Sequence, residues 1–560
     1  MHFFSVTVAD GEEKTGVQGI YDLVGEDAAM TGNAVEQASS QILAVSQAMK
    51  AIMIIAPLII LVLLLSTTSW VEPFVYLTTI GVAVIINWGA QIFWGEMSYV
   101  TMAVSPILQL AVSLDYAVFL CNSFEEHRKE GVGVETAMKR AVKASFKAIA
   151  ASAATTLFGF VALVFMDFKI GTDMGISLVR GVILSFISVM VFLPALMLFV
   201  YKLVDKTRHR RFMPDFHNCG RLLTKIAAPV LVLVVVLFLP CYLGQKNNSF
   251  IYGSGEPSKE SRLGQDEEKI REVFEEYTVA ALMVLAGDST SETLLCDELE
   301  KMKHVKSIIS YAKMVGNKIP SGYLAESITK QFYSDQYARI VVYTDTEAEG
   351  EVAFQTVKEI KDTAGKYYDE VYMCGQSANM YDMKECVEAD NKRVDMITVI
   401  AIFLVLLIEF KSLILPVLLI VVIKTAVFIN MSIPYFMGGD MCYIGYLVVG
   451  TVMMGATIDY AILLTEHYML YRKEMPKKKA MKKTLGSVVK SALVSAMILA
   501  VAGFALGATS SEEIVRVLGM LLGRGAIIAF VLSITLLPAI LLLTDRLIPI
   551  FTRKADFYKE

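Results

Sequence analysis

Two Asp-Tyr pairs lie inside long apolar segments of this chain, Asp115-Tyr116 and Asp459-Tyr460, and they are 344 residues apart. The same spacing recurs without a gap at further landmarks: Gly159-Phe160 and Gly503-Phe504, Arg180-Gly181 and Arg524-Gly525, and Leu193-Pro194-Ala195 and Leu537-Pro538-Ala539. Further upstream the spacing is 343, as between Asn87 and Asn430. Because apolar, glycine and charged positions all match, the chain consists of two homologous halves.

The composition, 55% hydrophobic and 19% charged residues, excludes an ordinary soluble protein of this length. The sequence predicts a polytopic α-helical membrane protein with a duplicated bundle. Eleven apolar stretches are long enough to cross a bilayer: 49–68, 73–94, 98–122, 146–166, 174–201, 224–243, 393–410, 413–433, 441–465, 488–508 and 516–544.

Lys and Arg clusters follow the third, fifth and ninth of these stretches, at 128–147, 202–211 and 472–483. Short loops rich in Lys and Arg face the cytoplasm, so these three loops are expected there. The acidic loops at 438–440 and 510–513 are expected on the other face, together with the large polar insert. We therefore predict a multi-pass protein of the cytoplasmic membrane with an extracytoplasmic domain. Membrane topology explains the basic runs, and no nucleic-acid partner is expected.

The polar insert is predicted to be a ferredoxin-like α+β domain, a split βαβ fold. Its segments alternate as strand 279–285, helix 292–302, strand 305–310, strand 338–343, helix 352–364 and strand 370–374.

The predicted organisation follows the repeat. Residues 1–48 are predicted to be the remnant of a first extracytoplasmic domain, and residues 49–211 form the first transmembrane half with five helices. Residues 212–243 form a cytoplasmic linker and the first helix of the second half, and residues 244–392 form the second extracytoplasmic domain. Residues 393–548 form the second transmembrane half with five helices, and residues 549–560 form a cytoplasmic tail. By the repeat, roughly 120 residues with a twelfth span and most of a first extracytoplasmic domain are expected before Met1.

The sequence contains no pattern for a metal, a cofactor or ATP hydrolysis. Its seven cysteines are scattered without a CxxC motif, and no phosphate-binding GxxxxGK[ST] loop occurs. Cys296, Cys374 and Cys386 fall in the insert, where one disulfide or free thiols are both compatible with the sequence. The chain is not predicted to be an enzyme. If it performs work, an ion gradient is the remaining energy source.

The paired aspartates are the candidate site, a proton relay formed by Asp115, Tyr116, Asp459 and Tyr460. A carboxylate at membrane depth is costly, and burial favours its neutral form, so protonation comes within reach of physiological pH. Each tyrosine can donate a hydrogen bond to the ionised carboxylate or accept one from the neutral acid.

Polar residues on neighbouring spans are candidates to support the relay: Ser152, Thr155, Ser491, Ser495 and Lys424. The repeat partner of Lys424 is Gly81, so symmetry does not support a role for this lysine. Pairing with an inward carboxylate and snorkelling toward a cavity or the surface both stay open for it.

Segments Ser113–Tyr116 and Gly455–Tyr460, with the Gly-Phe and Leu-Pro-Ala landmarks, resemble the RND superfamily and, within it, the MMPL family. The resemblance covers essentially the whole chain. It departs from the family pattern at Ala111, which replaces the first glycine of GxxxDY in the first half. The resemblance implies a secondary exporter of lipids or other hydrophobic molecules, a proton antiporter driven by proton entry.

Other functions share these features. A SecDF-like aid to protein translocation has the same fold and ion coupling, and a sterol- or lipid-sensing Patched-like protein would bind without pumping. An intramembrane aspartyl protease also needs two aspartates, but its Tyr-Asp and Gly-x-Gly-Asp signatures are absent. Membrane lipids, a hydrophobic substrate and protons are the expected partners, and whether the chain forms a homo-oligomer stays open.

Overall fold

The structure is a computed structural model in which the chain forms two compact units. One unit contains Met1–Glu36 and Phe250–Ala389, and the other contains Gln37–Ser249 and Asp390–Glu560. The residues described are 4, 6–9, 11–25, 28–93, 95, 97–210, 212–213, 216, 219–253, 261–273, 278–316, 319, 323–510, 512–553 and 557–558, with the backbone alone for 43–49. We call the unit of Met1–Glu36 and Phe250–Ala389 the polar unit, and the unit of Gln37–Ser249 and Asp390–Glu560 the helical unit.

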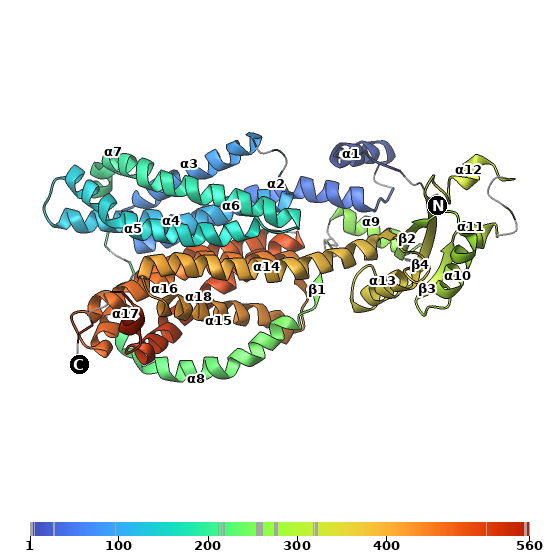
Figure 1. Ribbon diagram of the computed structural model, residues 1–560. Coiled ribbons are helices and arrows are strands. Elements are labelled where there is room, and N and C mark those ends of the chain that lie inside the picture. Colours follow the sequence, from blue (N-terminus) through green and yellow to red (C-terminus); the bar gives the residue numbers. More distant parts are fainter. Residues whose placement is uncertain are drawn as a thin grey trace. The chain divides into compact units, whose positions relative to one another are not determined.

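The helical unit is a bundle of long helices (Figure 1). In the described part of the chain, nine helical segments are long and apolar enough to cross a membrane. They are α3 (Glu72–Gly89) with the short turn Ala90–Phe93, α4 (Tyr99–Lys129), α5 (Val134–Leu163), α6 (Lys169–Ile187) continued through the turn Ser188–Phe192 by α7 (Leu193–Lys206), α8 (Cys219–Lys246), α15 (Ile414–Met437), α16 (Tyr443–Arg472), α17 (Lys477–Thr509) and α18 (Glu513–Thr544). A short helix, α19 (Ile548–Phe551), follows them.

The two other expected spans, 49–68 and 393–410, lie in α2 (Asn33–Ser66) and α14 (Gln376–Phe410). In α2 the described apolar stretch is shorter, Lys50–Ser66. In α14 the predicted stretch includes three charged residues, Arg393, Asp395 and Glu409. Among the residues whose side chains are described, nine segments meet the length and composition of a span by themselves.

The sequence repeat is also a structural repeat. Helix α16 begins 344 residues after α4, and α18 begins 344 residues after α6. The Asn87 side chain donates to the Ser177 carbonyl oxygen at 3.1 Å, and the matched Asn430 side chain donates to the Leu521 carbonyl oxygen at 2.9 Å. Equivalent side chains thus join equivalent helices in each half.

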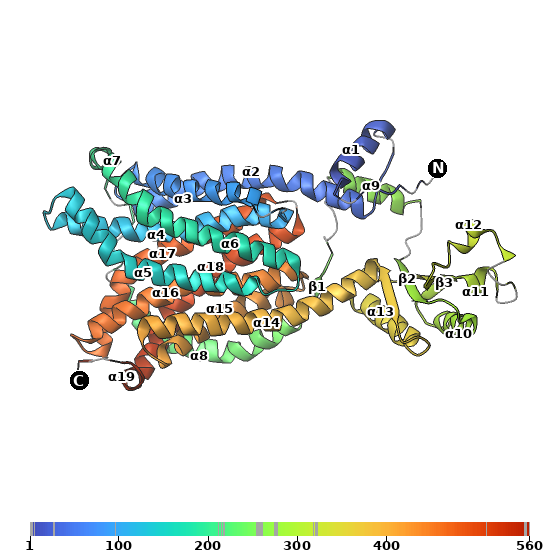
Figure 2. The same ribbon diagram turned by 45° about the horizontal axis from the view of Figure 1, so that its top comes forward.

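Helices α4 and α16 lie at the centre of the bundle. Burial covers 78% of the apolar window of α4 and 83% of that of α16, more than in any other span of the described chain. Both helices are apolar on all sides, so every face must pack against protein or lipid. Each contacts a helix of the opposite half: α4 packs against α17, and α16 packs against α5 (Figure 2).

The polar unit contains an antiparallel sheet with the strand order β3-β4-β2-β5. The predicted split βαβ order is confirmed by β2 (Thr278–Leu285), α10 (Ser289–Leu299), β3 (Val305–Ile309), β4 (Tyr337–Thr344), α13 (Glu351–Ala364) and β5 (Val371–Gly375). Strand β2 alternates buried and more exposed residues, as a sheet with one covered face requires. Leu282, Ile340 and Val342 pack with Leu295 and Ile360 in its core.

The predicted remnant 1–48 belongs to both units, which separate after Glu36. The remaining short elements of the chain are α1 (Glu13–Val24), β1 (Phe250–Ile251), α9 (Arg262–Arg271), α11 (Tyr311–Met314), α12 (Glu326–Thr329) and β6 (Met441–Cys442). Within the polar unit, α1 is held to α9, because the Tyr21 hydroxyl donates to Asp266 at 2.9 Å and the Arg262 guanidinium lies 3.8 Å from the Tyr21 ring.

All seven cysteines are free thiols, which resolves the alternative left open for the insert. Cys374 is exposed, whereas Cys296 is buried in the core of the polar unit. Burial raises the pKa of the Cys296 thiol to about 11, so it stays neutral and behaves as an apolar core residue.

Candidate functional site

The two Asp-Tyr pairs lie in the middle of the two central helices. Asp115 and Tyr116 are near the midpoint of α4, and Asp459 and Tyr460 are at the matched place in α16. Both tyrosines are almost fully buried, with exposed fractions of 2% and 3%, and both aspartates are partly buried. The apolar length of each helix therefore places a carboxyl group far from either helix end.

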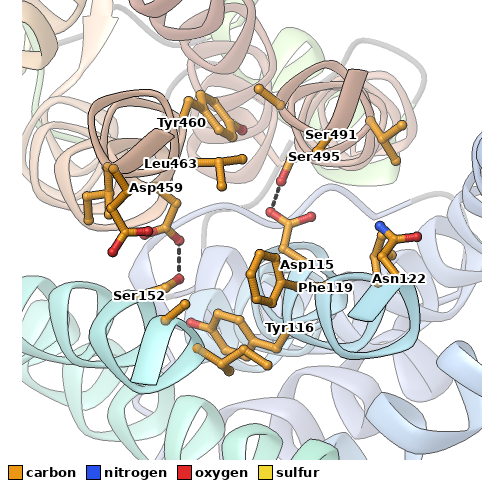
Figure 3. A pocket seen from close by; sticks show the side chains of 17 residues that line it. Asp115, Tyr116, Phe119, Asn122, Ser152, Asp459, Tyr460, Leu463, Ser491 and Ser495 are labelled. Carbon is orange, nitrogen blue, oxygen red and sulfur yellow. Dashed lines mark hydrogen bonds between the residues drawn. The ribbon is translucent and has the colours of Figure 1, made fainter. Parts of the chain in front are cut away.

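Each aspartate is hydrogen-bonded to a serine of the opposite half (Figure 3). The Ser152 hydroxyl, on α5, donates to Asp459 Oδ2 at 2.5 Å. The Ser495 hydroxyl, on α17, donates to Asp115 Oδ2. Thr155 lies 3.5 Å from the other Asp459 oxygen and also donates to the Ser152 carbonyl oxygen at 2.7 Å. The carboxyl groups thus bridge the two halves at two places.

The two carboxyl groups line one cavity, in which about 100 Å³ is open to the centres of water-sized molecules. A single water needs roughly 10–15 Å³ by this measure, so several waters fit. The polar part of the lining consists of Asp115, Tyr116, Asn122, Ser152, Asp459, Tyr460, Glu466, Ser491 and Ser495. Apolar side chains such as Phe119 and Leu463 complete it. A cavity lined by two carboxyl groups inside an apolar bundle is a place where a carboxyl group can exchange a proton with water.

The tyrosines flank this cavity in different surroundings. In Figure 3 the Tyr116 hydroxyl is directed toward Ser152, the serine that binds the opposite aspartate. The Tyr460 ring packs edge-on against Phe530, with ring centroids 6.4 Å apart. Among the described residues, no hydrogen bond joins either tyrosine hydroxyl to an aspartate, so the predicted Tyr-Asp bond is not formed in this structure.

Most of the predicted supporting residues are near the aspartates, and Lys424 is not. Ser491 lines the cavity beside Ser495. Lys424 forms an ion pair with Asp395 of α14 and lies 5.9 Å from the Phe428 ring. This lysine therefore pairs with a carboxylate, but with a half-exposed one rather than the inward carboxylate of the first alternative, and it is not among the residues that line the cavity.

Comparison with known proteins decides the family. A model described as "MMPL family" matches residues 14–230 and 260–556. The chain belongs to the MMPL family.

Several relatives are membrane or transport proteins. The membrane protein YdfJ of Bacillus subtilis is 21% identical over 81% of this MMPL chain and 63% of its own length. The sulfolipid-1 exporter MmpL8 of Mycobacterium tuberculosis is 31% identical over 23% of this chain and 12% of its own length. The chain thus spans about two thirds or less of the curated relatives it matches.

A solved structure shares the fold. SecDF from Thermus thermophilus, a translocon-associated membrane protein, superposes with a TM-score of 0.60 over 90% of this chain and 62% of its own, at 12% identity. The predicted polytopic helical RND-type fold is confirmed by this likeness, by the MMPL match and by the membrane-length helices.

Two cavity residues of the MMPL chain were missed by the sequence analysis, Asn122 and Glu466. Each follows its aspartate by seven residues, which is two helical turns and returns a side chain to the same face. The two positions are also 344 residues apart and therefore match in the repeat. A search along the Asp115 and Asp459 faces of the two helices would have found them.

Proposed function

We propose that this MMPL protein is an exporter of lipids or other hydrophobic molecules driven by an ion gradient, with protons as the ions and Asp115 and Asp459 as the proton-binding groups. The observation that carries the proposal is the pair of repeat-matched carboxyl groups that line one cavity. A carboxyl group inside an apolar bundle is costly when charged and is retained where it has a task, such as proton binding.

Proton binding at this site changes how the two halves are joined. An ionised carboxylate only accepts hydrogen bonds, whereas a neutral carboxylic acid also donates one. Ser152 donates to Asp459 across the α5–α16 contact, and Ser495 donates to Asp115 across the α4–α17 contact. Protonation therefore alters both contacts between the halves, which is a local charge change acting on helix packing.

The energy available is adequate for export. Under a membrane potential of about 100 mV, one entering proton supplies about 2.3 kcal/mol, which sustains roughly a fortyfold substrate gradient if fully coupled.

The substrate class and sidedness are part of the proposal. A lipid or hydrophobic cargo is supported by the relative whose name describes a sulfolipid-1 exporter, although the match covers 12% of that protein. The Lys- and Arg-rich loops support a cytoplasmic location for the ends of α4 and α16 at Lys129 and Arg472. The likeness to SecDF concerns the fold and adds no argument for protein translocation.

The test is proton uptake into liposomes that contain the full natural protein, after the external pH is lowered. We expect Asp115→Asn and Asp459→Asn each to lower the protein-dependent flux by at least tenfold, in line with the factor of roughly 10²–10⁴ that a positioned proton-transfer group contributes. Asparagine keeps the size of the side chain and can still accept from the serine, so folding should be retained.

Asp395→Asn is the matched control, because Asp395 is a carboxylate of α14 that is paired with Lys424 and does not line the cavity. It should leave flux close to that of the wild type. Wild-type flux that persists in either Asp115→Asn or Asp459→Asn would refute the relay. In cells, the surface lipids of wild type and Asp115→Asn are then compared by mass spectrometry, and identical profiles would contradict lipid export.

A further inference from the structure

A third carboxyl group lines the cavity of the aspartates. Glu466 lies on α16, seven residues after Asp459 and six residues before the helix ends at Arg472. At a rise of 1.5 Å per residue, it is about 10 Å from Asp459 along the helix axis and about 9 Å from the Arg472 end. It therefore lies midway between the aspartates and the Lys- and Arg-rich end of the bundle.

The other half has no titratable group at the matched position. Asn122, seven residues after Asp115 on α4, lines the same cavity and carries an amide. An amide can hold a water molecule by hydrogen bonds, but it does not bind and release a proton at physiological pH. One half of an otherwise repeated site thus has a third proton-binding group, and the other half does not.

Charged groups near Glu466 extend from the cavity toward the protein surface. Glu409 of α14 acts electrostatically on the Glu466 carboxyl group. Glu409 Oε1 lies 2.9 Å from Lys147 Nζ of α5, and the exposed fraction is 11% for the Glu409 side chain and 76% for Lys147. Two neighbouring carboxyl groups can hold a proton between them, and the lysine stabilises the charge that stays when the proton leaves.

The cavity lining holds other titratable groups besides Glu466. They are Asp115 and Tyr116 of α4 and Asp459 and Tyr460 of α16. Asn122 of α4 and Ser491 of α17 also line the cavity. Asp459, Glu409 and Lys147 act electrostatically on the Glu466 carboxyl group.

We propose that Glu466 is the proton-release group of the relay and that protons from both aspartates leave through the second half of the repeat. This inference rests on the proposed function. A neutral Asp115 or Asp459 gives its proton to water in the cavity, water gives a proton to the Glu466 carboxylate, and Glu466 releases it toward the Lys- and Arg-rich end of the bundle. The cavity has room for several waters, enough to connect groups about 10 Å apart.

A structural role for Glu466 makes a different prediction. In that case the Glu466–Glu409–Lys147 contacts serve to pack α16 against α14 and α5, and a carboxyl group placed on α4 instead would not replace them. The double variant Glu466→Asn with Asn122→Glu moves the carboxyl group across the cavity to the matched position. It keeps the cavity composition and breaks the contact with Glu409.

The experiment measures proton uptake in liposomes for the wild type, Asp459→Asn, Glu466→Gln, Glu466→Asp and the double variant. We expect Glu466→Gln to lower flux at least tenfold. We expect Glu466→Asp and the double variant each to recover at least half of the wild-type rate. Thermal melting of each purified variant reports whether folding is retained.

The outcomes separate this inference from the proposed function. Loss of flux in Glu466→Gln, with recovery in Glu466→Asp and the double variant, supports release through Glu466. Wild-type flux in Glu466→Gln while Asp459→Asn abolishes flux would overturn the release role and leave the proposed function intact. Loss without recovery in the double variant would assign Glu466 a structural role. If Asp459→Asn leaves flux unchanged, the proposed function fails and this inference fails with it.

Discussion

The α17–α18 contact allows a sharp test of how the second half is packed. Glycines of the two helices face each other, Gly503 and Gly507 on α17 and Gly519 and Gly523 on α18. A Cβ atom added at Gly503 would lie 2.8 Å from the Gly519 carbonyl oxygen and closer still to the Gly523 nitrogen. Backbone atoms block this Cβ, so no side-chain rotation can make room.

The cost follows from this distance. Ordinary contact of a Cβ atom begins at 3.4 Å, so Gly503→Ala must push the two backbones apart by more than half an ångström. Overpacking of this kind costs about 1–3 kcal/mol. Replacing glycine by alanine in a helix returns about 0.5–1 kcal/mol. We therefore expect a net destabilisation of roughly 1–2 kcal/mol, caused by the loss of close helix packing between small residues.

Gly450→Ala is the matched control, because a Cβ atom at Gly450 of α16 has no neighbour within 4 Å. Its melting temperature in detergent should equal or exceed that of the wild type, whereas Gly503→Ala should melt several degrees lower. Equal melting temperatures for the two variants would refute the close backbone contact between α17 and α18.

Two further substitutions test the structure away from the cavity. Arg472→Met should destabilise the protein by about 3–5 kcal/mol in the same melting experiments, because it leaves the buried Asp545, which is 4% exposed, without its arginine. Arg128→Met, which removes the partner of the more exposed Asp205, should cost no more than about 1 kcal/mol. Equal losses of stability in the two variants would contradict the difference in burial. Leu282→Ala should destabilise the sheet of the polar unit by about 2–5 kcal/mol, because Leu282 is fully buried in its core. Amide hydrogen exchange in β2 and β4 of the full natural protein should then become faster. Unchanged exchange rates would argue against this core.

The fold was largely predictable because its elements have strong periodic signals. Long apolar runs predicted the helices, and alternation with turn residues predicted the sheet around Leu282. The expected span in α14 carries a weaker apolar signal, because charged residues such as Arg393 and Glu409 lie in it. Residues 1–48 belong to two units, which separate after Glu36. This boundary depends on tertiary contacts, and local sequence patterns do not predict such contacts.

The site was predictable only in part. Asp115 and Asp459 stood out because charges are rare in apolar spans, and Ser152 and Ser495 were named as partners. That each serine binds the aspartate of the opposite half depends on the packing of α5 on α16 and α17 on α4, which the sequence does not specify. Glu466 was missed because it lies near a Lys- and Arg-rich helix end, where a carboxylate attracts no notice.

The repeat departs from its regular spacing at the two serines that bind the aspartates. Ser495 follows Ser152 by 343 residues, whereas the surrounding landmarks are spaced by 344, so the two serines reach their aspartates from neighbouring rather than equivalent helix positions. Consecutive helix positions differ by about 100° around the axis, so α5 and α17 cannot present the same face to the opposite half.

The difference continues at the next matched polar position, where Asn122 of α4 and Glu466 of α16 both line the cavity. In the proposed mechanism, two binding groups that share one release group cannot unload at the same moment, because a protonated Glu466 is unable to accept a second proton. The aspartates would then discharge in sequence, and the two contacts between the halves, α4 with α17 and α5 with α16, would change one after the other. Two identical halves would not impose an order on the two proton-release steps. In the proposed mechanism, the differences between Asn122 and Glu466 and between the two serine positions therefore give the transport cycle its order.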